Sequence, residues 1–440
     1  MSNARNLSKF KPSSSGLVET ADIADNAITT AKITDGNITT AKIADANITT
    51  AKVADDAITG AKIENNPTIA GNLTVSGGLI PSTSLASPNM ITNGDMAVCQ
   101  RATSSTGQSS SGIKCVDQFH YIHSGGGTSD ISQSSTAPNE FKNSLKVECN
   151  SVDSSLGATD LVGIRHHIEA QHCQKLLFGT SSAKSITISF HVRSKQTGTY
   201  ALNLFLDDDY PQFTKTYTIS SADTFEKKTI TFPANTSAVI EDDTGKGIEF
   251  TWFLRAGSTY TSGSAMSGYE AYSSGDYAVG HAVDFLDNSA NEFYLTGVQL
   301  EIGEVATPFK YETFAENLKR CQRYYCKSPS YGTAPGHGMD GITNCVSIDM
   351  ASNLMRTDRF FFPTSMRANP TVTCHAQSGV GGSNTGQWAG YISSTWTHFS
   401  FSGGNVTTEG FCGAAGSTAG SQDGYAYWTH ANWEATAELG

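Results

Sequence analysis

Large apolar residues recur at every fifth position near the start of the chain, within a ten-residue repeat that spans residues 21–66. A step of five turns a helix by about 500°, so these side chains cannot gather on one helical face. The same step places successive side chains on opposite sides of a strand. The pattern therefore predicts short extended pieces, separated by turns at polar steps such as Asp35-Gly36-Asn37. The recurring residues are Ile23, Ile28, Ile33, Ile38, Ile43, Ile48, Val53, Ile58 and Ile63.

A single copy of this repeat has too few apolar residues to enclose a core of its own. Several copies around a shared axis could bury all of them, so we expect residues 21–66 to form an intertwined homotrimeric shaft. A low-complexity linker is the alternative interpretation. Residues 1–20 form a short basic stretch, either a flexible tail or a peptide that attaches the shaft to a larger assembly. We expect residues 67–88 to be a linker.

Strict alternation of apolar and polar residues replaces the repeat in residues 89–312. Alternation with period two is typical of strands that bury one face. Gly-, Ser-, Asp- and Asn-rich spacers separate the runs, which predicts an antiparallel β-sandwich or jelly roll. The alternating apolar residues are Leu145, Val147, Cys149, Ile186, Ile188, Phe190, Val192, Leu202, Leu204, Leu206, Ile230, Phe232, Ile248, Phe250, Trp252 and Leu254.

A short connecting helix is predicted within residues 313–327. Thr313 and Glu316 have the spacing of a capping box, in which each side chain bonds the backbone of the other. Phe314, Leu318, Cys321 and Tyr325 then follow at helical spacing and predict one apolar stripe over about 12 residues. The helix either packs on its own sandwich or joins two others on a trimer axis. We expect a mixture, with Leu318 and Cys321 pointing inward and Tyr324 or Tyr325 covering a neighbouring subunit.

The last segment, residues 328–440, is rich in Gly and Ser and predicts a further, distal β domain. The fold class is therefore mainly β: a repeat shaft, a sandwich, a connecting helix and a C-terminal β domain. Four of the five tryptophans of the chain lie in this last segment: Trp388, Trp396, Trp428 and Trp433.

Composition narrows the possible partners. The formal net charge of −12 argues against nucleic acid and against an anionic membrane surface. No apolar run approaches 18 residues, and the first residues lack the apolar core of an export signal, which disfavours a secreted adhesin. Nine cysteines, with no Cys-x-x-Cys pair, indicate reduced thiols that serve as small core residues.

Aromatic residues between positions 388 and 399 are the best candidates for binding a ligand. Sugars are held by aromatic faces together with a few converging polar groups, and this stretch supplies both. We expect Trp388 and Tyr391, which have glycine neighbours, to be the more exposed. The alternative for any one aromatic residue is a place in the core. The candidate glycan-binding residues are Trp388, Tyr391, Trp396 and His398.

No sequence motif predicts a catalytic residue or a metal site. The acidic runs at 207–209 and 241–243 are interpreted as solvated turns, with a structural calcium ion as the minor alternative. His166, His167 and His172 match no metal-binding spacing and are expected to have structural roles. No cofactor is predicted.

Several segments resemble the fibres of tailed bacteriophages. The run from Asn89 to Arg101 is similar to the opening of a jelly-roll module of such fibres, which is itself similar to carbohydrate-binding modules, and 295–303 resembles its end. The segment 360–373 resembles fibre C-terminal domains, 433–439 resembles their closing strand, and the decapeptide repeat resembles fibre shafts. The sequence departs from the module at Met96-Ala97, where an aromatic residue and a Glu are common. That departure weakens the transfer of a calcium site involving Asn93 and Asp95.

The resemblance implies a homotrimeric virion protein, made in the host cytoplasm, that binds a host polysaccharide or lipopolysaccharide without cleaving it. Residues 1–20 would dock on the tail or on another virion protein, and no membrane insertion is implied. A tailspike-type glycan hydrolase or lyase is the alternative. It would need paired carboxylates, for which Asp284, Asp287 and Glu301 are the candidates. A fibre on the capsid, or a connector between virion proteins, is the third hypothesis.

Overall fold

The protein is described by a computed structural model, in which the chain divides into two units, Met1–Ile80 and Pro81–Gly440. The structure describes Thr29, Ile33 and the ranges 89–336, 343–350, 354–376, 385–392, 394–400, 404–416 and 426–439. The predicted attachment peptide, shaft and linker therefore lie outside the described residues, apart from two positions. The homotrimeric shaft stays a prediction.

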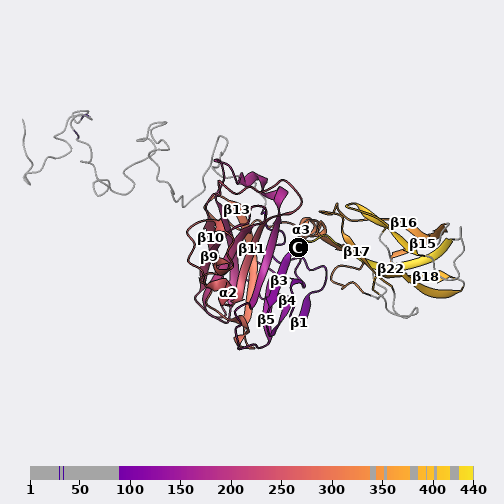
Figure 1. Ribbon diagram of the computed structural model, residues 1–440, viewed down its shortest axis with the longest axis horizontal. Coiled ribbons are helices and arrows are strands. Elements are labelled where there is room, and N and C mark those ends of the chain that lie inside the picture. The colour runs from indigo at the N-terminus through magenta and orange to yellow at the C-terminus, as the bar shows by residue number, and fades with distance from the viewer. Residues whose placement is uncertain are drawn as a thin grey trace, which may run out of the picture. The chain divides into compact units, whose positions relative to one another are not determined.

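The first sheet of the second unit has six antiparallel strands in the order β1-β4-β5-β13-β7-β10. Figure 1 labels β1, β4, β5, β10 and β13 of this sheet. Its neighbours in space are often far apart in sequence, since β13 lies between β5 and β7. The strands are β1 Ser104–Gln108, β4 Thr128–Ser134, β5 Ser144–Ser151, β13 Glu292–Ile302, β7 Ile186–Ser194 and β10 Glu226–Phe232.

The second sheet has seven strands in the order β12-β9-β8-β11-β6-β3-β2. Short helices connect some of them: η6 Ala170–Leu176, α2 Ser258–Thr261, η7 Ser274–Asp276 and η8 Phe285–Asp287. The strands are β12 Glu270–Ala271, β9 Pro211–Ile219, β8 Gly198–Leu206, β11 Lys246–Ala256, β6 Leu161–Glu169, β3 Phe119–Ser124 and β2 Gly112–Ile113.

These two sheets pack face to face and form the predicted β-sandwich. Phe190 of β7 meets Trp252 of β11 at 5.7 Å between ring centroids, and Phe213 of β9 meets Phe232 of β10 at 5.6 Å. Every apolar residue that the alternation selected in residues 145–254 is buried in this one core. The mainly β fold class and the sandwich are confirmed, because side chains two residues apart on a strand share a face.

The connecting helix α3 spans Phe314–Gln322 and has the predicted capping box. Thr313 Oγ1 accepts a hydrogen bond from the Glu316 backbone N–H at 3.3 Å, and Glu316 Oε2 accepts one from the Thr313 N–H at 3.1 Å. The helix is shorter than the expected 12 residues because Tyr325 already begins strand β14, Tyr325–Lys327.

The apolar stripe is only partly buried, which corrects the prediction. Cys321 and Tyr325 are fully buried, Leu318 is half-buried, and Phe314 is exposed and packs edge-on against Tyr331. Phe314 stands in the first turn of the helix.

Polar residues of α3 hold it on its own sandwich. Asn317 Oδ1 accepts from the Asn93 N–H at 3.1 Å, and Arg320 donates to the Asn89 carbonyl at 3.1 Å. Tyr324 is also buried on its own sandwich, where its hydroxyl donates to Glu169 at 2.9 Å. Tyr325 is likewise buried within its own chain, so the expectation that one of the two tyrosines covers a neighbouring subunit is wrong. A three-helix junction stays a prediction.

A nine-stranded sheet forms from the described strands of the C-terminal segment, in the order β19-β18-β22-β15-β16-β21-β20, with β14 and β17 also paired to β22. Strand β22 is its centre, since its first half pairs with β15 and β18 and its second half with β14 and β17. The strands are β15 Thr343–Met350, β16 Leu354–Phe361, β17 Thr371–His375, β18 Gln387–Ile392, β19 Thr395–Ser400, β20 Gly404–Thr407, β21 Gly410–Gly416 and β22 Ala426–Thr436.

The cysteines whose side chains are described are all free thiols, and all but Cys412 are buried. They serve as small core residues, as expected. Among the described residues, no helix has the length and apolar character that crossing a bilayer requires.

Candidate binding site

Three aromatic side chains lie in one row across β22, β18 and β19 of the C-terminal sheet. Tyr391 is directly opposite Trp428 on one side and Trp396 on the other. Directly opposed residues of antiparallel strands point to the same face, and the ring centroids confirm this, at 5.3 Å for Tyr391–Trp396 and 5.8 Å for Trp396–Trp428. Trp428 is 55% exposed and Tyr391 45%. We call these three residues the aromatic row.

Beside the aromatic row, the same face carries a small residue between two histidines. Two residues away from the row on each strand, Ala389 of β18 lies opposite His430 of β22 and His398 of β19. The His430 ring lies 4.5 Å from that of Trp396, and burial, followed by the nearby His398, lowers its pKa below the usual value. His430 is therefore a neutral imidazole at pH 7, able to donate and to accept hydrogen bonds. Within the described residues, its Nε2 atom has no partner.

The prediction that Trp388 is exposed is wrong. Its side chain is 1% exposed and stacks on Phe360, with the ring centroids 5.7 Å apart, in the core of the C-terminal sheet. The physical reason is the period of a strand: positions 388 and 391 differ by an odd number, so they point to opposite faces of β18. Because one face of β18 is packed in the core, Trp388 and Tyr391 cannot both be exposed.

Trp428 is the site residue that the sequence interpretation missed. The alternation in β22 places Trp428 and Trp433 on opposite faces, which the sequence shows. It does not show which face is covered, and the pairing of Trp428 with Tyr391 joins residues far apart in the chain. Of the four predicted residues, the structure brings together Tyr391, Trp396 and His398.

A second aromatic surface lies on the sandwich. Phe205 lies 5.8 Å from both Tyr210 and Tyr272, whose rings are exposed. Glu249 of β11 is directly opposite Phe205 and lies beside it on the same face. It is buried, accepts from His167 at 3.0 Å and pairs with Arg165 at 2.9 Å.

Burial alone would raise the pKa of Glu249, but the hydrogen bond from His167 and the positive charge of Arg165 lower it to about 2. This carboxylate is therefore ionised and already paired within the protein. Its role is to join β11 to the neighbouring strand β6 beside these aromatic residues, through His167 and Arg165.

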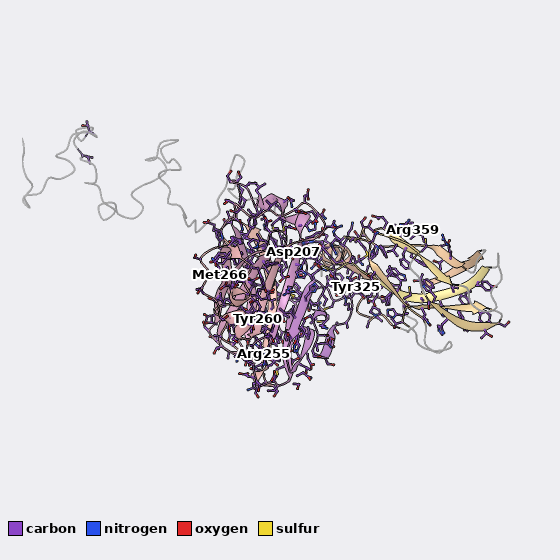
Figure 2. The ribbon with its side chains drawn as sticks, in the orientation of Figure 1. Asp207, Arg255, Tyr260, Met266, Tyr325 and Arg359 are labelled. Carbon is purple, nitrogen blue, oxygen red and sulfur yellow. The ribbon has the colours of Figure 1, made fainter. Side chains whose placement is uncertain are left out.

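Each carboxylate named for a hydrolase is engaged by its own neighbours. Asp284 lies 3.3 Å from the buried guanidinium of Arg255, which Figure 2 labels. Asp287 accepts from Asn291 at 2.8 Å, and Glu301 accepts from the Thr307 N–H at 2.9 Å. All three have structural partners, and Glu301 stands on a different element from the other two.

The oxygen atoms considered for calcium also have protein partners. Asn93 Oδ1 accepts from the Val98 N–H at 2.8 Å, and Asp95 accepts from Asn317 at 2.9 Å. In the acidic run at 207–209, Asp208 and Asp209 accept backbone N–H groups of residues 241 and 239.

The histidines considered for a metal are placed separately. His166 packs against Phe119, and His167 bonds Glu249 and the Leu439 carbonyl. Across the ranges that the structure describes, no cluster of three or more His, Cys, Asp or Glu side chains is arranged to hold a metal ion.

No family model and no curated protein sequence matches the chain. Solved structures with a similar arrangement include the enzymatically active domain of tailspike protein 4 of bacteriophage CBA120, at 10% identity and a TM-score of 0.25. That match covers 42% of this chain and 19% of the tailspike chain, so the chain spans about a fifth of that relative's length.

Two further solved structures are similar to this chain over nearly all of their own length. The family 11 carbohydrate-binding module of the Clostridium thermocellum cellulase Lic26A-Cel5E has 12% identity and a TM-score of 0.24, covering 46% of this chain and 98% of that one. A putative sugar-binding protein of Bacteroides thetaiotaomicron has 11% identity and a TM-score of 0.25, covering 49% and 100%.

Proposed function

We propose that the chain is a homotrimeric tail fibre of a tailed bacteriophage that attaches the particle to its host by binding a cell-surface glycan, without cleaving it. The observation that carries the proposal is the aromatic row. Trp428 and Tyr391 are exposed, and the half-buried Trp396 packs against both on the same side of the sheet. Exposed aromatic residues gathered in this way mark recognition surfaces.

The chemistry of the aromatic row suits a saccharide. Sugar rings have apolar C–H faces that stack on aromatic rings, and hydroxyl groups that need donors and acceptors nearby. His430, His398 and Gln387 lie on the same face as the row. The His430 Nε2 atom has no hydrogen-bond partner among the described residues, so it is a polar group that a sugar hydroxyl could satisfy beside the row.

The decapeptide repeat supports the fibre and the trimer. Its isoleucines need sister subunits to be buried, and three linked sites would strengthen binding by avidity, so each site can be weak. Native mass spectrometry of the full chain at micromolar concentration tests this part, and a monomer would contradict it.

A glycan array probed with the full chain tests the binding itself. The expected result is binding to a restricted set of bacterial polysaccharides that Trp428→Ala weakens. Phe361→Ala is the matched control, because Phe361 is also exposed, in the same sheet, but lies on β16 outside the aromatic row. Equal binding by the parent chain and Trp428→Ala would contradict the proposal.

The non-enzymatic part is tested with the polysaccharides that the array selects. We expect size-exclusion chromatography to show unchanged chain lengths after incubation with the protein. Shortened chains would favour the hydrolase or lyase instead.

A further inference from the structure

A cavity of about 490 Å³ lies on the outer face of the six-stranded sheet, away from the aromatic row. Ser189 and His191 of β7 and Lys227 of β10 contribute to it from the sheet. The segment 306–311 forms another side with the rings of Phe309 and Tyr311. Tyr311 is 58% exposed, so its ring is open to a ligand.

This cavity is held open by a glycine and a buried glutamine. Gly297 sits in a bulge of β13 with φ of +61°, and a Cβ there would lie 2.5 Å from the Phe141 ring and 2.9 Å from His191 Nδ1. The buried Gln299 fixes the segment above it, since its Oε1 accepts from the Lys310 N–H at 2.8 Å. Phe309 then packs against both Phe141 and Tyr311, at 5.0 Å in each case.

His191 contributes a polar atom without a protein partner. Its Nδ1 is buried and, in the part of the chain that the structure describes, makes no hydrogen bond. A buried unpaired nitrogen is costly unless a ligand or water satisfies it. The His191 ring lines the cavity, and its Nδ1 atom lies on the side of Gly297 and Phe141.

A second cavity, of about 610 Å³, shares Tyr311 as a wall. One face of α3 lines it with Glu316, Lys319 and Arg320, and Arg323 follows directly after the helix. Residues spaced by three and four share a helical face, so these charges point into the same space.

Two of the three cations in this second cavity are fixed by partners. Arg320 pairs with Glu312 at 2.6 Å and Arg323 with the buried Glu169 at 2.6 Å. Lys319 is exposed, and among the described residues no ion pair involves it. A cationic group is thus available to a ligand, in a chain whose net charge is −12.

We propose that the two cavities form one groove for an acidic oligosaccharide, with Tyr311 as the platform between them. One sugar ring stacks on Tyr311, while its carboxylate or phosphate group lies against Lys319. The inference names a second site and a class of glycan, and it does not depend on the aromatic row.

The experiment is an array of bacterial oligosaccharides in neutral, uronate-bearing and phosphate-bearing forms, probed with the full chain and with single variants. We expect binding to at least one acidic class, and about tenfold weaker binding with Tyr311→Ala, because it removes the stacked ring. Tyr311→Phe should keep the binding. Lys319→Gln should weaken binding to acidic glycans and leave neutral ones unchanged.

Phe361→Ala, which removes an exposed ring outside every candidate surface, is the control and should bind normally. Absence of acidic binding by the parent chain, or acidic binding that neither Tyr311→Ala nor Lys319→Gln alters, would overturn the groove. Acidic binding lost only with Trp428→Ala would also overturn it while supporting the aromatic row. Acidic binding lost with Tyr311→Ala and retained with Trp428→Ala supports the groove alone.

Discussion

Two tryptophans of the same sheet should respond to truncation in opposite ways. Trp428→Ala removes an exposed ring of the aromatic row, so it should weaken glycan binding and leave the fold intact. Trp388→Ala removes a ring that is 1% exposed in the core, so it should destabilise the C-terminal sheet. Comparing the two variants therefore distinguishes the proposed binding face of the sheet from the face that is covered by the core.

The magnitudes follow from the exposed areas. A Trp side chain buries about 250 Å² when fully covered, so 55% exposure leaves about 140 Å² on Trp428. A sugar ring on one face covers about half of that area, about 70 Å², which is worth ~1.7 kcal/mol at about 25 cal/mol per Å². Binding should therefore weaken by about twentyfold. Truncating a buried Trp costs about 3–5 kcal/mol of folding stability.

The assay is a pair of titrations on each variant. Urea unfolding, followed by tryptophan fluorescence, should give Trp428→Ala the parent midpoint and Trp388→Ala a lower one. A binding titration with the glycan chosen on the array should show the twentyfold loss for Trp428→Ala. Full binding by Trp428→Ala, or a parent-like urea midpoint for Trp388→Ala, would refute the assignment of the two faces.

Three further predictions concern charges and ions. Arg255→Met should lower the free energy of unfolding by about 3 kcal/mol or more, because the buried guanidinium lies within 3.3 Å of Asp153, Asp160 and Asp284. Urea unfolding measures this loss, and an unchanged midpoint would contradict it. Burial lowers the pKa of His166 to about 3, so its contribution to stability is complete above pH 6.5 and is lost as the pH falls towards 3. His166→Phe should therefore lose less stability than the parent chain between pH 6.5 and 4, and parallel pH profiles would argue against it. Treatment with a chelator should leave glycan binding unchanged, because Asn93, Asp208 and Asp209 use side-chain oxygen atoms within the protein. Binding that is lost with the chelator and restored by calcium would contradict that assignment.

Local rules were enough to predict much of the fold. Period-two alternation selected the buried faces of β7 and β11, and the spacing of Thr313 and Glu316 located the start of α3. Both signals act over a few residues, where the backbone geometry alone decides which side chains meet.

On the outer face of β11, the period-two alternation no longer predicts which side chains are exposed. Glu249 and Arg255 are polar residues that alternation assigns to solvent, yet both are buried. They are covered and paired by residues distant in sequence, such as His167 for Glu249 and Asp153 for Arg255. Such long-range partners leave no signal in the local pattern.

The candidate site was predictable to the same extent. The stretch around Tyr391 and Trp396 carried the aromatic residues, but the strand period was needed to remove Trp388. Trp428 joins them only through the pairing of β22 with β18. The proposed groove at Tyr311 could not be predicted from the sequence, because it depends on how the segment 306–311 packs beside residues of β7 and β10.

A crystal structure of the full chain with the oligosaccharide selected on the array tests the proposed site most directly. The account predicts a sugar ring in van der Waals contact with Trp428 or Trp396, with a hydroxyl group within hydrogen-bonding distance of His430 or His398. A saccharide bound only at the tyrosines near Phe205, with the aromatic row uncovered, would contradict it.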